Sequence, residues 1–103
     1  MKEKILIVDD ERLIRQSLQK ALAGQGYAVL PAENGKTAIH LLEEESPDLV
    51  LLDLKLPDIN GIELLKRLRE LDRNLPVLLI TAYGSIDTAI QAIRLGAYDY
   101  ITK

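Results

Sequence analysis

The chain alternates between short apolar runs and longer segments in which apolar residues recur every three or four positions. The apolar runs cover residues 5–8, 27–32, 49–52, 77–80 and 97–102. A run without polar alternation indicates a strand that is buried on both faces, as in a parallel sheet. The second run is more mixed and contains Pro31, which has no backbone N–H to donate, so we expect it at an edge of the sheet.

The segments between these runs have the periodicity of amphipathic helices. Three of them cover residues 11–23, 36–45 and 62–72. A fourth helix is expected to open at Gly84-Ser85, with Ser85 as a candidate N-cap, and to end at Gly96. Its predicted inward stripe consists of Ile86, Ala89, Ile90 and Ile93.

Five strands that alternate with four helices predict an α/β fold, in which a doubly wound parallel sheet carries helices on both faces. The length of 103 residues suits a single domain. No helix follows the fifth strand in the sequence, so we expect part of one sheet face to be uncovered.

Composition narrows the classes of function. The formal net charge is -3, which argues against direct nucleic-acid binding. Cysteine is absent, so disulfides, thiol catalysis and cysteine-based zinc sites are excluded. The apolar run at the N-terminus is too short for a signal peptide and no stretch is long enough for a membrane span, so we expect no membrane association and a cytoplasmic location.

Polar residues with the potential for chemistry follow the predicted strands. Asp9 and Asp10 follow the first strand, Asp53 the third, Thr81 the fourth, and Lys103 the last. Because parallel strands end at one edge of a sheet, we expect these side chains to lie close together. Clustered carboxylates repel one another and require a cation or a proton, and Mg²⁺ is the natural oxygen-binding cation. The predicted site therefore suits phosphoryl chemistry with a carboxylate nucleophile.

Four motifs at these positions together resemble the receiver domain of two-component response regulators. They are Val8-Asp9-Asp10, residues 52–61, Ile80-Thr81-Ala82 and Tyr100-Ile101-Thr102-Lys103. The resemblance covers the whole chain. It implies a flavodoxin-like five-stranded sheet with the strand order 2-1-3-4-5. It also implies that a sensor histidine kinase is a partner.

The resemblance implies specific roles for the residues at the strand ends. Asp53 would accept the phosphoryl group. Asp10, Asp53 and the backbone carbonyl of Lys55 would bind Mg²⁺ directly, and Asp9 would contribute through water. Thr81 would donate a hydrogen bond to the phosphoryl group, Lys103 would pair with it, and Tyr100 would be an aromatic switch that swings inward as Thr81 moves.

Residues 81–89 and 95–100 are similar to receivers attached to σ54-dependent transcriptional activators, which implies control of transcription. Two features depart from the family pattern. Family receivers continue past the lysine with a proline and a fifth helix, and neither is present in this sequence. The sequence also includes no output domain. We therefore expect residues 1–103 to form a receiver domain without its usual C-terminal helix, with homodimerisation or aberrant association through the uncovered sheet face.

Two other functions fit parts of the pattern. An aspartyl-nucleophile phosphohydrolase could use the same sheet, but such enzymes tend to place a second carboxylate two residues after the nucleophile, where this chain has Lys55. A degenerate receiver could act only as an interaction module, although the complete acidic set argues against it. We expect a switch that catalyses its own transient phosphorylation and is not otherwise an enzyme.

Overall fold

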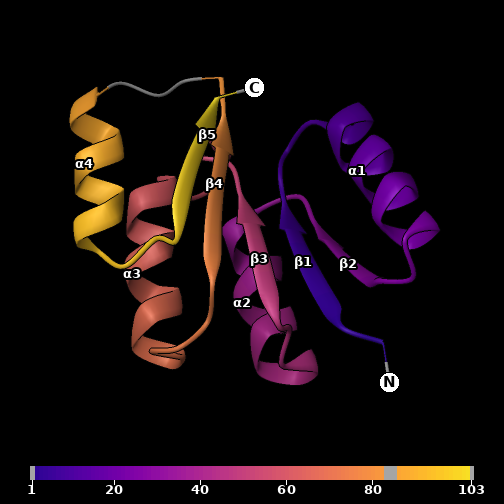
Figure 1. The fold of residues 1–103 in the computed structure, drawn as a ribbon. Coiled ribbons are helices and arrows are strands. Elements are labelled where there is room, and N and C mark those ends of the chain that lie inside the picture. Colours follow the sequence, from indigo (N-terminus) through magenta and orange to yellow (C-terminus); the bar gives the residue numbers. More distant parts are fainter. Residues whose placement is uncertain (1, 83–85, 103) are drawn as a thin grey trace.

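The computed structural model describes residues 2–82 and 86–102, in which five strands and four helices alternate (Figure 1). The strands are β1 (Lys4–Val8), β2 (Ala28–Ala32), β3 (Leu49–Leu52), β4 (Val77–Thr81) and β5 (Asp99–Thr102). The helices are α1 (Arg12–Gly24), α2 (Gly35–Glu45), α3 (Gly61–Leu71) and α4 (Ile86–Arg94). Every predicted element is present, with shifts of one or two residues at most of the ends. The expected N-cap Ser85 and Lys103 lie outside the described residues.

The strands form one sheet in the order β2-β1-β3-β4-β5, and all neighbouring pairs are parallel. This is the order that the resemblance implied. Strand β2 lies at the edge, as Pro31 predicted, and Pro31 is exposed. Val8 pairs with both Ala32 and Leu52, so the ends of β1, β2 and β3 lie level with one another.

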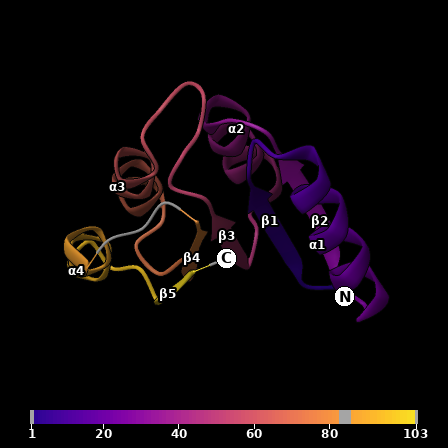
Figure 2. The ribbon, with the colours of Figure 1, turned by 90° about the horizontal axis from the view of Figure 1, so that it is seen from above.

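The two faces of the sheet are covered very differently (Figure 2). Helices α2, α3 and α4 lie on one face, which we call the covered face. Its core includes strand residues from β1, β3 and β4 and the fully buried helix residues Leu64, Leu65 and Leu68. On the other face, the open face, α1 is the only helix within the described part of the chain.

The open face has a small core. Ile5, Ile7 and Leu51 are buried there, whereas Leu78 and Ile80 are only partly buried. Ile101 pairs with Ile80 in register, and Ile101 is 44% exposed. No residue of α1 is fully buried. The expected uncovered part of one sheet face is therefore present among the described residues.

Helix α4 differs from its prediction. Its buried residue is Ala92, whereas Ile90 is 47% and Ile93 is 49% exposed. The predicted stripe was therefore wrong in phase at these two positions. Ala92 is the α4 residue that joins the covered-face core. No helix in the described ranges is long and apolar enough to cross a membrane.

Candidate functional site

The sheet fixes the positions of two carboxylates at its carboxyl edge. Asp9 and Asp53 directly follow Val8 and Leu52, which pair in register. The Asp9 backbone N–H donates to the Ala32 carbonyl at 3.0 Å, and the Asp53 backbone N–H donates to the Val8 carbonyl at 2.9 Å. Both residues are therefore tied to neighbouring strands, and their side chains start from adjacent points at the end of the sheet.

Three carboxylates come together at this edge. Asp9, Asp10 and Asp53 each place a carboxylate oxygen within 4.8 Å of the others. Asp9 is 3% and Asp53 2% exposed, whereas Asp10 is exposed and open to solvent. Buried carboxylates this close together repel one another unless a cation is present, and an all-oxygen donor set suits Mg²⁺ or Ca²⁺. The predicted acidic cluster is therefore present and could hold a divalent metal ion.

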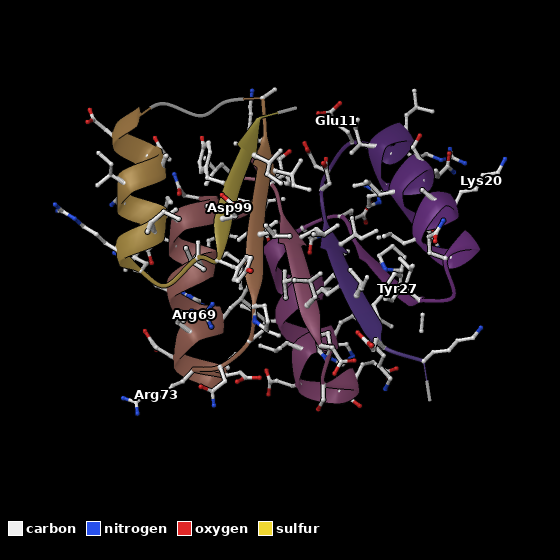
Figure 3. The ribbon with its side chains drawn as sticks, in the orientation of Figure 1. Glu11, Lys20, Tyr27, Arg69, Arg73 and Asp99 are labelled. Atoms are coloured by element: carbon white, nitrogen blue, oxygen red, sulfur yellow. The ribbon has the colours of Figure 1, made fainter. Side chains whose placement is uncertain are left out.

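The segment between β1 and α1 supports the cluster. The Asp9 carboxylate accepts a hydrogen bond from the Glu11 backbone N–H at 2.9 Å, which fixes its orientation. Arg15, one turn into α1, donates from Nη1 to the Asp9 backbone carbonyl at 2.7 Å. Glu11 occupies the N-cap position of α1, without a capping hydrogen bond from its side chain, and Figure 3 shows it beside the end of β1. The sequence singled out these acids but gave no indication of Arg15.

The loop after β3 is compact and close to Asp53. The Lys55 backbone N–H donates to Asp53 Oδ1 at 3.3 Å, and Lys55 forms an antiparallel bridge with Asn60. The Gly61 backbone N–H donates to the Leu54 carbonyl at 2.8 Å. A Cβ atom at Gly61 would collide with the Leu54 backbone and lie 2.8 Å from the Asp53 carbonyl oxygen, so only glycine permits this approach. The start of α3 thus packs directly on the backbone of Asp53 and Leu54.

Thr81 and Tyr100 lie on the covered face of adjacent strands. Thr81 ends β4 and is completely buried. It lies two residues beyond Leu79, which pairs with Leu52 on one side and with Tyr100 on the other. The Tyr100 ring packs against the covered-face core, and burial raises the pKa of its hydroxyl. That hydroxyl is buried and has no hydrogen-bond partner in the part of the chain that the structure describes.

One residue near the site was not predicted to have a role. Asp58, in the loop after β3, accepts hydrogen bonds from the backbone N–H groups of Gly35 at 2.8 Å and Lys36 at 3.0 Å. The hydrogen bond from Gly35, followed by that from Lys36, holds the pKa of the Asp58 carboxyl below its ordinary value of 3.8. The only signal in the sequence was a turn-type loop containing an aspartate, which does not reveal its partner 23 residues away.

The chain matches a known family over nearly its whole length. The profile of the response regulator receiver domain matches residues 5–103. Sporulation initiation phosphotransferase F of Bacillus subtilis is 45% identical over 103 residues, which are all of this chain and 83% of that protein. Regulatory protein AtoC of Escherichia coli is 46% identical over 100 residues, which are 97% of this chain. The chain spans only 22% of the length of AtoC.

A solved structure with the same fold contains a modified site. It is a response regulator protein from Burkholderia pseudomallei with a phosphorylated aspartic acid, a calcium ion and citrate, and its TM-score with this chain is 0.93. The two are 33% identical over 99% of this chain and 60% of that one. The similarity therefore extends from sequence to fold.

Proposed function

The chain belongs to the response regulator receiver domain family, whose members accept a phosphoryl group and thereby regulate an output, and we propose that Asp53 is the acceptor. One observation supports this proposal most directly. Asp53 is almost completely buried at the end of a central strand and lies within 4.8 Å of two further carboxylates. The B. pseudomallei regulator, which carries a phosphorylated aspartic acid, supports the same chemistry by analogy.

Receiver domains bind Mg²⁺ at an acidic pocket, and the donor set of this chain suits that ion. We propose that Asp10, Asp53 and the Lys55 backbone carbonyl bind Mg²⁺ directly and that Asp9 contributes through water. When bound, the ion would neutralise charge on the phosphoryl oxygens. Asp9 is held by the Glu11 N–H, so its carboxylate is oriented before any ion arrives.

The proposed transfer requires no separate general base, because an ionised carboxylate is already a nucleophile. An oxygen of Asp53 forms a bond to phosphorus as the bond from phosphorus to the histidine nitrogen of the kinase breaks. The electron pair of that bond leaves with the histidine. The product is an acyl phosphate on Asp53, and the chain itself catalyses its own transient modification.

The other residues act on the product. Thr81, at the end of β4, would donate its hydroxyl hydrogen to a phosphoryl oxygen, and Lys103 would pair with the same group. As Thr81 moves toward the phosphoryl group, Tyr100 would occupy the space on the same face of the sheet. The register supports this coupling, since Tyr100 pairs with Leu79, two residues before Thr81.

Labelling with a small phosphodonor tests the proposal. Acetyl phosphate with Mg²⁺ should add one phosphoryl group to the chain, detected by intact-mass spectrometry, and chelation with EDTA should abolish the addition. Asp53→Asn should remove the label, whereas the exposed helix variant Glu44→Gln should retain it. A label that remains on Asp53→Asn would contradict the assignment. Many turnovers of phosphate release per chain would instead favour the phosphohydrolase.

The output is part of the proposal as well. The similarity of residues 81–89 and 95–100 to receivers of σ54-dependent activators leads us to propose that the chain controls transcription through an attached output domain, in the cytoplasm. We expect Asp53→Asn to change the activity of the attached output domain, because the variant receiver would not be phosphorylated. Equal output activity of the wild type and this variant in cells containing the kinase would contradict it.

The open face is a further part of the proposal. In a longer protein we expect a helix that follows residue 103 to cover it, and we expect the 103-residue chain alone to pair with a second copy through it. Ile101, which is 44% exposed and pairs with Ile80, provides the apolar surface. Light scattering should show concentration-dependent association that Ile101→Lys reduces. A wild-type monomer at millimolar concentration would contradict this part alone.

A further inference from the structure

We propose that Asp58 is a positioning residue for the metal site: its carboxylate fastens the loop after β3 to the first turn of α2 and thereby holds the Lys55 carbonyl in place. The inference rests on the proposed function, in which that carbonyl binds Mg²⁺. Asp58 itself does not touch the metal or the phosphoryl group. Its role is to limit the movement of a loop that carries a ligand three residues away.

Asp58 joins the loop to α2 through both oxygens of its carboxylate, a pair of contacts that we call the Asp58 clamp. One carboxylate oxygen accepts from the Gly35 N–H at 2.8 Å and the other accepts from the Lys36 N–H at 3.0 Å. These amides belong to the first turn of a helix, where backbone N–H groups have no partner within the helix. The positive end of the α2 dipole lies at the same point and favours a negative charge there. Both oxygens of one side chain are therefore engaged by α2.

The neighbouring residue strengthens the same junction. Ile59 packs so closely on Gly35 that a Cβ atom on that glycine would collide with the Ile59 side chain. Gly35 is buried under this contact. Two consecutive loop residues, one by hydrogen bonds and one by packing, are thus fixed to the start of α2, although 22 and 23 residues of sequence separate the hydrogen-bonded pairs.

The opposite end of the loop is fixed differently. Gly61 bonds to the Leu54 carbonyl, and Lys55 bridges to Asn60, so these contacts close the base of the loop on itself. None of them connects the loop to α2. Asp58 and Ile59 near the tip supply that connection, while Leu56 packs against the covered-face core. A carbonyl ligand requires placement to within a few tenths of an ångström, because metal–oxygen distances vary little.

Asn34 offers a matched control. Its Oδ1 accepts from the Thr37 N–H at 2.8 Å, so it caps the same helix without touching the loop after β3. Asn34→Ala and Asp58→Ala therefore both remove a side-chain cap from α2, and only Asp58→Ala also frees the loop. Asp58→Asn retains one carbonyl oxygen as acceptor and should behave as an intermediate.

The experiment measures Mg²⁺ affinity by NMR titration and the rate of Asp53 labelling by acetyl phosphate as a function of Mg²⁺ concentration. We expect Asp58→Ala to raise the Mg²⁺ dissociation constant about tenfold, the lower range for supporting residues of metal sites. Asp58→Asn should raise it less, and Asn34→Ala should leave it unchanged. The labelling rate at saturating Mg²⁺ should stay equal in all three variants. Metal-free spectra should show altered amide shifts at Lys55 only in the Asp58 variants.

Two outcomes would overturn the proposal alone. One is an unchanged Mg²⁺ dissociation constant in Asp58→Ala, and the other is an equal weakening in Asn34→Ala, which would assign the effect to helix stability. A wild-type chain that binds no Mg²⁺ and takes no label would overturn the proposed function together with this inference, and the wild-type titration distinguishes that case from the other two.

Discussion

The covered and open faces of the sheet are built from the same five strands but differ in what packs on them. On the covered face, three helices bury a continuous core from Leu6 to Ala97. On the open face, α1 packs without one fully buried residue, and Ile101 remains 44% exposed. The comparison is clearest within β5, where Tyr100 turns its hydroxyl into the covered core and Ile101 turns its apolar side chain outward.

The difference indicates where the stability of the domain resides and which face of the sheet contains Thr81. Asp53 is almost completely buried and Thr81 is fully buried. Thr81 lies on the covered face, which has the larger core. Close-packed protein interiors transmit strain instead of absorbing it. In the proposed switch, a displacement of Thr81 would be transmitted to Tyr100 through the packed side chains of the covered face.

The largest expected effect is the loss of stability when a leucine is truncated on the covered face, compared with a leucine on the open face. Leu68→Ala, in the covered core, should lower the free energy of unfolding by about 2–5 kcal/mol, because it leaves a cavity. Leu78→Ala, on the open face, should cost less than about 1.5 kcal/mol, since that side chain is already partly exposed. Urea denaturation with unchanged slopes measures both. Equal losses would mean that the two faces contribute alike.

The next test concerns the contact of α3 with the site. Gly61→Ala inserts a Cβ into the backbone of Leu54, where nothing flexible can move aside, and should cost about 1–3 kcal/mol. It should also slow Asp53 labelling, because the displaced backbone carries the proposed acceptor. Gly24→Ala is the control, since a Cβ there meets nothing. Normal stability and labelling in Gly61→Ala would show that α3 can shift freely.

A smaller test concerns the buried hydroxyl of Tyr100. Removing a buried group without a partner relieves a desolvation penalty, so Tyr100→Phe should stabilise the chain by about 1 kcal/mol. Burial raises the pKa of this group above 10.0, so the folded state holds its proton longer than the unfolded state. The wild type should therefore lose stability as the pH rises past 10. Thermal melts of both proteins at neutral and alkaline pH check this, and a destabilised Tyr100→Phe would imply a hidden partner.

The smallest expected effect is the acid sensitivity of the Asp58 clamp. The pKa of Asp58 is lower in the folded chain than its ordinary value of 3.8, so its stabilising contribution is complete above that value. The contribution is lost as the pH falls through the folded pKa. Melting temperatures recorded from about pH 6 down to pH 3 should fall slightly less for Asp58→Asn than for the wild type. Parallel curves would mean that the carboxylate charge does not stabilise α2.

Much of the fold could be predicted because it follows from periodicity. Continuous apolar runs specified the strands. Glycine or Ser46-Pro47 marked the ends of helices, and Gly26, Ser46 and Gly96 adopt positive φ at these points. The phase of a short helix is less determined. In α4 the sequence offered isoleucine at several angles around the helix, but Ala92 is the buried residue and Ile90 and Ile93 are about half exposed.

The acidic cluster could also be predicted, since parallel strands must end at one edge and each delivers the residue after its last apolar position. The clamp of Asp58 on Gly35 and Lys36 could not. It joins a loop to a helix through main-chain amides, which every residue possesses, so the sequence contains no complementary side chain to reveal the pair. Arg15 was missed for the same reason, because its acceptor is the Asp9 backbone carbonyl.

The strand order has a consequence for the way the domain is assembled during synthesis. Strand β1 lies between β2 and β3, so its pairing is complete once residue 52 has been added, and β4 and β5 then join one after the other at a single growing edge. The ribosome delivers the chain from the N-terminus at about 5–20 residues per second. Asp9, Asp10 and Asp53 all lie within the first 53 of the 103 residues, whereas Thr81 arrives with the fourth strand. The three carboxylates of the acidic cluster are thus synthesised first, and Thr81, which we propose responds to phosphorylation, follows them.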